Sequence, residues 1–147
     1  RPGRQCAHNL NYWQFGDYLG LGAGAHGKLT EAGSGDIVRT TQQREPRRYQ
    51  ARPVEGLQRG VVPAADLPFE FLMNSLRLVE GFELSLFAAR TGLPETALLP
   101  GLRREQARGL LEQVEDRWRA TARGQRFLND VIGAFLPDTN SQAVTGA

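Results

Sequence analysis

Histidine, amide and aromatic side chains cluster near the start of the sequence, at spacings that suit a metal-bearing ligand. Residues 8–13 read His-Asn-Leu-Asn-Tyr-Trp, and His26 follows after a glycine-dense stretch. Imidazole nitrogen is a common ligand of haem iron, and tyrosine and tryptophan offer flat, amphipathic rings. Together these residue types suit a flat aromatic ligand that carries a metal. The alternative is a surface or structural role for His8, which is the more frequent role of a histidine judged by residue type alone.

The glycine-dense stretch contains a literal Gly-x-Gly-x-x-Gly match at Gly22, Gly24 and Gly27. In a dinucleotide-binding fingerprint these glycines lead from a strand into a helix whose N-terminus holds the pyrophosphate. Here Gly27 leads into Lys-Leu-Thr and a second glycine-rich turn, so the context does not fit nucleotide binding. Glycine also allows close approach to the backbone, because it has no Cβ. Two interpretations stay open: a strand packed close to another element, or a strand that lines a cofactor pocket through Gly22 and Gly24.

Composition excludes several other kinds of site. Cys6 is the only cysteine, which excludes an internal disulfide and an all-cysteine metal site within this sequence. Cys6 and His8 would supply only two of the four ligands of a structural zinc. The 18 basic residues are interspersed with 16 acidic ones, which indicates a mixed solvated surface and no nucleic-acid partner. No apolar run reaches the roughly 20 residues that span a bilayer. We also expect this chain to be a fragment of a longer, cytoplasmic protein.

The elements expected to position these residues fall into two parts. Residues 1–65 are glycine-rich and predict strands and loops, with residues 17–21 as a buried strand. Residues 25–30 and 36–41 are predicted to pair as a hairpin. Residues 42–60 are polar and predict an exposed connection.

Residues 66–136 show helical spacing, and residues 137–147 predict a flexible tail. The expected order is a helix from Asp66, a helix over 83–90, a helix over 102–112, a strand over 117–121, and a last helix capped by Thr121. This α+β order is typical of a winged-helix-like module. In such a module the third helix would present Arg103, Arg104 and Arg108 to a DNA groove. A solvated arginine face is the alternative, which the interspersed acids favour.

The sequence resembles radical SAM proteins of the oxygen-independent coproporphyrinogen III oxidase type, and more narrowly their HemW-like heme chaperone branch. The resemblance depends on His8-Asn9-x-x-Tyr12-Trp13, on the stretch from Asp17 to Gly27, and on residues 68–74, 77–78 and 127–129. It extends over nearly the whole chain. The His-Asn-x-x-Tyr-Trp motif is specific to the chaperone branch.

The resemblance implies a longer parent with a (β/α) barrel, whose Cys-x-x-x-Cys-x-x-Cys loop binds a [4Fe–4S] cluster and S-adenosylmethionine. This chain has no such loop, so we do not expect it to be an enzyme by itself. Residues 1–65 would then be a strand and hairpin remnant of the barrel, and residues 66–136 the C-terminal helical domain.

The same resemblance implies a haem site. His8 would ligate or contact the haem iron, and Asn9, Tyr12 and Trp13 would shape the pocket. Gly22 and Gly24 would let their strand approach a cofactor in the intact barrel.

Three functional hypotheses follow. The first is a fragment of a heme chaperone that binds haem and delivers it to haemoproteins. The second is a fragment of a true coproporphyrinogen oxidase of porphyrin biosynthesis, and the third is a winged-helix DNA-binding module. We also expect self-association through residues 17–41, because glycine-rich strands without their sheet neighbours expose unpaired edges.

Overall fold

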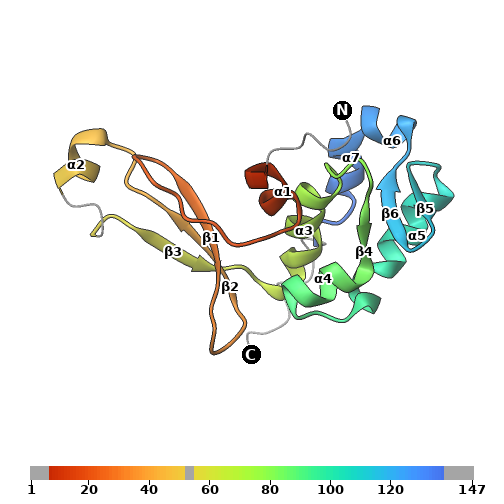
Figure 1. Ribbon diagram of the computed structural model, residues 1–147, viewed down its shortest axis with the longest axis horizontal. Coiled ribbons are helices and arrows are strands. Elements are labelled where there is room, and N and C mark those ends of the chain that lie inside the picture. The colour runs from red at the N-terminus through yellow and green to blue at the C-terminus, as the bar shows by residue number, and fades with distance from the viewer. Residues whose placement is uncertain (1–6, 52–54, 138–147) are drawn as a thin grey trace, which may run out of the picture.

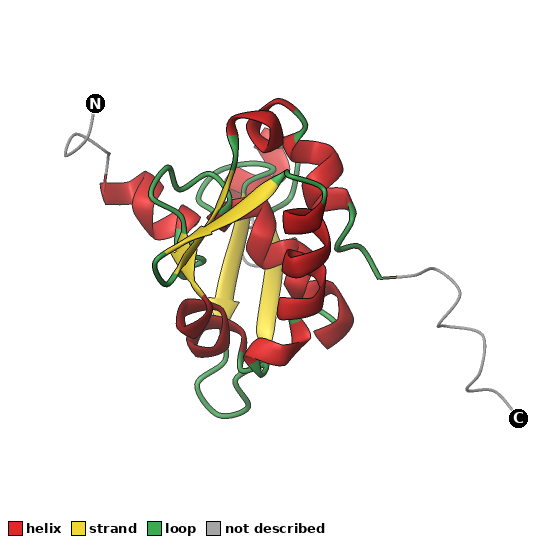
Figure 2. Ribbon diagram, turned by 90° about the vertical axis from the view of Figure 1, so that its right-hand side faces the viewer, coloured by secondary structure: helices red, strands yellow, loops and turns green. Residues whose placement is uncertain are grey.

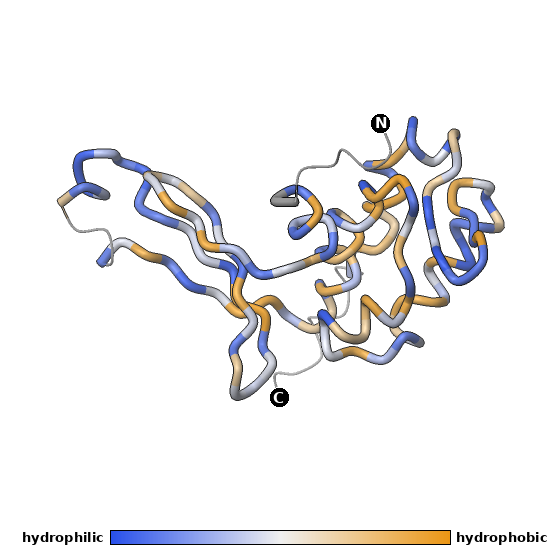
Figure 3. The backbone as a smooth tube through the Cα atoms, in the orientation of Figure 1, coloured by the Kyte–Doolittle hydropathy of each residue, from blue (hydrophilic) through white to orange (hydrophobic). Residues whose placement is uncertain are grey.

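The computed structural model describes residues 7–51 and 55–137, and the side chains of these ranges from Asn9 onward. Cys6 and nearly all of the predicted tail lie outside the described residues. Figure 1 shows two regions, an arm that ends at α2 (Pro46–Ala51) and a larger helical body. The arm is hydrophilic at its far end, whereas apolar residues follow the inner course of the body (Figure 3).

The arm is a three-stranded antiparallel sheet in the order β1 (His26–Thr30), β2 (Ile37–Thr41), β3 (Gln58–Val61). Leu29 lies opposite Val38 across the β1–β2 pair, which confirms the predicted hairpin. The predicted exposed connection over 42–60 contains α2 and β3, and most of its described residues are exposed. The prediction of strands and loops over residues 1–65 is wrong at α1 (Ala7–Trp13) and α2. A polar sequence does not reveal an edge strand such as β3, because all four residues of this strand are exposed.

The predicted buried strand over 17–21 is also wrong. Tyr18 forms only an isolated antiparallel bridge with Lys28, and Leu19 and Leu21 are 68% and 81% exposed. This segment runs beside the outer strand β1. The apolar residues that suggested burial therefore face solvent at the rim of the sheet.

The body contains the remaining helices and a second three-stranded sheet in the order β4-β6-β5 (Figure 2). Its elements are α3 (Leu67–Ser75), β4 (Phe82–Glu83), α4 (Leu84–Thr91), α5 (Leu99–Ala107), β5 (Leu111–Val114), β6 (Arg117–Ala120), α6 (Ala122–Arg126) and α7 (Leu128–Gly133). Short 3₁₀ turns at Ala64–Asp66 and Glu95–Ala97 precede α3 and α5. The fold is thus a mixed α+β fold.

Local signals placed several of these elements correctly. Thr121 caps α6, because its hydroxyl oxygen accepts a hydrogen bond from the backbone N–H of Gly124 at 3.0 Å. Gly92 ends α4 in the left-handed conformation, with φ of 71°. The predicted third helix over 102–112 is wrong at its end, since Gly109 (φ 70°) turns the chain and residues 111–114 form β5.

Phe71 of α3 is fully buried at the centre of an aromatic core. Its ring lies edge-on to those of Phe15, Phe82 and Phe87, with centroids 5.6, 5.1 and 5.2 Å away. Each buried aromatic side chain contributes about 1.5–3 kcal/mol. Phe15 comes from the N-terminal side of residue 65, so the core includes residues from both sides of that boundary. The division into two domains at residue 65 stays a prediction.

Phe15 also ends α1 (Ala7–Trp13) in an unusual way. The N–H of Phe15 donates to Tyr12 O, and the N–H of Gly16 donates to Asn11 O, which is the Schellman pattern. Glycine usually occupies the left-handed position of this motif, but here Phe15 holds it with φ of 57°. The left-handed conformation costs a non-glycine residue about 1–2 kcal/mol. Burial of the Phe15 ring, which is 1% exposed, offsets that cost.

None of the helices within the described ranges combines the length and the apolarity needed to cross a bilayer.

Candidate functional site

The predicted haem residues lie together on helix α1. Positions 8, 9, 12 and 13 span about 140° of its circumference, because successive residues are about 100° apart. Asn9 is exposed, and Tyr12 and Trp13 are half-buried, with Trp13 packed against the core. The side chain of His8 lies outside the described residues. The helix therefore brings the four positions to one side, while their role towards haem stays a prediction.

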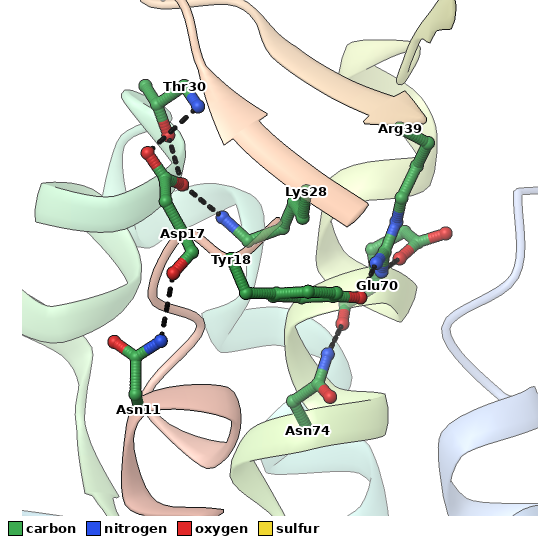
Figure 4. A network of polar contacts seen from close by, with 8 residues as sticks. All are labelled: Asn11, Asp17, Tyr18, Lys28, Thr30, Arg39, Glu70 and Asn74. Atoms are coloured by element: carbon green, nitrogen blue, oxygen red, sulfur yellow. Dashed lines mark hydrogen bonds and ion pairs between the residues drawn. The ribbon is translucent and has the colours of Figure 1, made fainter. Parts of the chain in front are cut away.

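Tyr12 is in contact with a residue that the sequence analysis did not select. Its ring lies 4.2 Å from the ring of Tyr18, centroid to centroid, at an interplanar angle of 47°. The hydroxyl of Tyr18 accepts a hydrogen bond from Arg39 Nη1 at 2.6 Å, and Arg39 forms an ion pair with Glu70 of α3. Figure 4 shows Tyr18 reaching from the Asp17 side of this network to Arg39 and Glu70.

A second polar group surrounds Asp17 at the end of the α1 turn. Its carboxylate accepts hydrogen bonds from Lys28 Nζ, Thr30 N and Thr30 Oγ1, each at 2.9 Å (Figure 4). The backbone carbonyl of Asp17 accepts from Asn11 Nδ2 at 2.9 Å, which ties this group to α1. The Lys28 ammonium lies 4.3 Å from the centroid of the Phe15 ring, a cation–π contact.

Lys28 is the only lysine of the chain, and it is 1% exposed. Burial, together with the charges of Arg39 and Arg90, lowers the pKa of Lys28 and outweighs the hydrogen bond and charge of Asp17, which raise it. Burial by itself raises the pKa of Asp17, but the bonds from Lys28 and Thr30 outweigh it, and the net pKa is below 3.8. No short-range sequence pattern pairs Asp17 with Lys28. The partner is eleven residues away, and only the bridge between Tyr18 and Lys28 brings it close.

Gly22 and Gly24 lie in a loop and adopt left-handed conformations, with φ of 110° and 72°. The N–H of Gly22 donates to the hydroxyl of Tyr49 at 3.0 Å, and a Cβ at Gly22 would meet nothing within 4 Å. Close approach occurs instead at Gly20 and Gly27, where a Cβ would lie 2.4 Å from a neighbouring atom. Backbone conformation thus explains Gly22 and Gly24, and their role in a cofactor pocket stays a prediction.

Two further features bear on ligands. A cavity of about 310 Å³ lies beside α1, lined in part by Leu10 and Gln14, which project from the side of the helix opposite Tyr12. Among the described side chains, those of residues 9–51 and 55–137, no group of three or more His, Cys, Asp or Glu could hold a metal ion. A [4Fe–4S] cluster needs thiolate ligands, and one cysteine does not fit that requirement.

Comparison with known proteins agrees with this fold. Residues 62–127 match the family model of the HemN C-terminal domain. The chain is 48% identical over 139 residues to the heme chaperone HemW of Escherichia coli (strain K12), covering 94% of this chain and 36% of that protein. It is 39% identical over 138 residues to the heme chaperone HemW of Haemophilus influenzae, with the same coverage of 94% and 36%.

A solved structure, described as the radical SAM enzyme coproporphyrinogen III oxidase (HemN) from Escherichia coli, has a TM-score of 0.52 and 21% identity. The alignment covers 82% of this chain and 28% of the HemN chain. It shows a similarity of fold. The chain spans about a third of the length of these HemW relatives. The family resemblance stated from the sequence is confirmed: residues 62–127 match the HemN C-terminal domain, and nearly the whole chain is similar to part of the HemW heme chaperones.

Proposed function

We propose that this chain is part of a haem chaperone that binds haem and passes it to recipient haemoproteins. The observation that supports this best is the 48% identity, over 94% of the chain, to a protein named heme chaperone HemW. The His-Asn-x-x-Tyr-Trp motif adds support, because its four named positions share one side of α1.

In this proposal His8 ligates the haem iron through an imidazole nitrogen. Tyr12 and Trp13 cover part of the porphyrin face, and Asn9 offers a polar contact at the exposed rim. A single exchangeable ligand with aromatic shielding suits a carrier, which must release its cargo to a recipient.

The remaining parts of the proposal concern the longer protein. A barrel supplied by other residues would hold the [4Fe–4S] cluster and S-adenosylmethionine, since this chain has one cysteine. Residues 1–65 would join that barrel, Gly22 and Gly24 would line its cofactor pocket, and the protein would be cytoplasmic. The order α3, β4, α4, α5, β5, β6 supports a winged-helix-like description of the C-terminal domain.

A haem titration followed by Soret absorbance tests the haem site. We expect saturable binding by the 147-residue chain and its loss in His8→Ala. His26→Ala is the matched control, because His26 is exposed and its Nδ1 lies 3.1 Å from Thr41 Oγ1 in the arm sheet. Equal haem affinity in the wild type and His8→Ala, or no saturable binding at all, would contradict the proposal.

The likeness of fold to coproporphyrinogen III oxidase supports a second candidate, a fragment of a porphyrinogen-decarboxylating enzyme. Turnover of coproporphyrinogen by the full-length protein would favour this candidate over the chaperone. A DNA-binding role has less support, because Arg104 of α5 and Arg108, which directly follows this helix, both pair with Glu105.

We further propose self-association through residues 17–41, in which the exposed Leu19 and Leu21 would take part. Light scattering should give a mass above that of one chain, and Leu21→Glu should reduce it. A single-chain mass at all concentrations would contradict this.

A further inference from the structure

We propose that Tyr18 is a positioning residue for the haem-binding side of α1, and that Arg39 and Glu70 hold it in place. The inference rests on the proposed function, since it assigns a role toward haem at that site. It also gives α3, and with it the HemN C-terminal domain, a part in haem binding.

The contact between Tyr18 and Tyr12 is the first step of the argument. Their ring centroids are 4.2 Å apart, shorter than the usual spacing of about 4.5–7 Å for aromatic pairs. Tyr12 follows His8 by four residues, so the two positions share one side of the helix. A ring packed against Tyr12 therefore limits the space in which Tyr12 can move beside His8.

Tyr18 is itself fixed at both ends. Its backbone N–H donates to Lys28 O at 2.8 Å, and its carbonyl accepts from Lys28 N at 2.9 Å. Its hydroxyl accepts from Arg39 Nη1 at 2.6 Å. A tyrosine anchored at the backbone and at the hydroxyl has little freedom to turn its ring away from Tyr12.

The third step leads into the body of the molecule. Arg39 lies on the central strand β2 and pairs with Glu70 of α3, and the two side chains are only 27% and 21% exposed. A partly buried pair is screened less by water and salt than an exposed one. Glu70 thus keeps the guanidinium where it can donate to Tyr18 (Figure 4). Contacts therefore run from α3 through β2 and Tyr18 to Tyr12 of α1.

Three variants of the 147-residue chain test the proposal. Tyr18→Phe keeps the ring and removes the hydroxyl, Tyr18→Leu removes the ring, and Glu70→Gln weakens the hold on Arg39. Glu83→Gln is the matched control, because it weakens a similar ion pair, 2.9 Å to Arg117, in the other sheet. Haem affinity and the Soret maximum are measured for each, together with urea unfolding, so that affinity is compared among folded molecules.

We expect Tyr18→Phe and Glu70→Gln each to weaken haem binding by about two- to tenfold, the loss of one hydrogen bond. Tyr18→Leu should weaken it further and shift the Soret maximum, and Glu83→Gln should match the wild type. Because Glu70 acts through Tyr18, the double variant Tyr18→Phe/Glu70→Gln should bind haem no more weakly than Tyr18→Phe alone.

The outcomes separate the two proposals. If the wild type binds haem through His8 and the Tyr18 variants keep its affinity and Soret maximum, the positioning role is wrong and the haem site stands. Additive losses in the double variant would also contradict the connection from Glu70. If His8→Ala binds as the wild type does, the haem site is wrong, and the role of Tyr18 is wrong with it.

Discussion

Removing the carboxylate of Asp17 should destabilise the chain more than removing the lysine that it pairs with. Lys28 is 1% exposed and lies against the Phe15 ring, so its ammonium has little access to water. In Asp17→Ala this charge stays buried without its carboxylate. In Lys28→Met the charge itself is gone, the apolar contact with Phe15 remains, and Asp17 keeps its two bonds to Thr30.

The expected magnitudes follow from burial. Breaking a buried ion pair by removing one partner costs about 3–5 kcal/mol, because the other charge stays buried, whereas replacing both partners with apolar residues is often neutral. The Asp17 side chain is 43% exposed, so water reaches the site and the cost falls to about 2–3 kcal/mol. In a chain of this size that loss lowers Tm by roughly 5–10 °C. Lys28→Met should change the free energy of unfolding by less than about 1 kcal/mol.

Urea unfolding followed by circular dichroism measures both variants and the double variant Asp17→Ala/Lys28→Met. The double variant should recover at least half of the loss seen in Asp17→Ala, because it no longer contains an unpaired charge. A larger loss in Lys28→Met than in Asp17→Ala would refute the reasoning. Equal stability of Asp17→Ala and Asp17→Ala/Lys28→Met would also refute it.

Three further predictions concern packing, capping and pH. Gly20→Ala should lower the free energy of unfolding in urea by about 1–3 kcal/mol, because its Cβ would lie 2.4 Å from a backbone carbonyl of β1. Gly33→Ala, whose Cβ would meet nothing within 4 Å, should be near neutral. Thr121→Ala should lower the free energy of unfolding by about 1 kcal/mol through loss of the α6 cap, and an unchanged urea midpoint would contradict this. Because the pKa of Asp17 is below 3.8 in the fold, the unfolded chain binds more protons there; stability should fall as pH drops below 3.8, and less steeply in Asp17→Asn.

Short-range patterns in the sequence predicted those elements that depend on neighbouring residues. The hairpin of β1 and β2 follows from alternation around a glycine turn, and the start of α6 follows from the threonine at position 121. Residues 17–21 were mistaken for a buried strand, because apolar composition does not reveal that a segment lies at the rim of a sheet.

The residue types of the candidate site are evident in the sequence, but its helix is not. Residues 1–65 were expected to form strands and loops, whereas α1 brings Tyr12 and Trp13 to one side with position 8. The contact of Tyr12 with Tyr18, and its support by Arg39, depend on long-range register and on the packing of β2 against α3. Those distances are set by the whole fold, and no local pattern in the sequence contains them.

Phe15 has a consequence for how α1 can move. The residue that reverses the chain after this helix is also an anchor of the aromatic core, so α1 cannot tilt as a rigid rod unless the Phe15 ring leaves its place beside Phe71. No single substitution at position 15 can both relieve the backbone strain and fill the core. Glycine would relax the backbone and leave a void, whereas any other residue would keep the strain. Movement of α1 therefore does not open or close its exposed side. The amide hydrogens of the last turn of α1 should exchange with solvent together with those of the aromatic core.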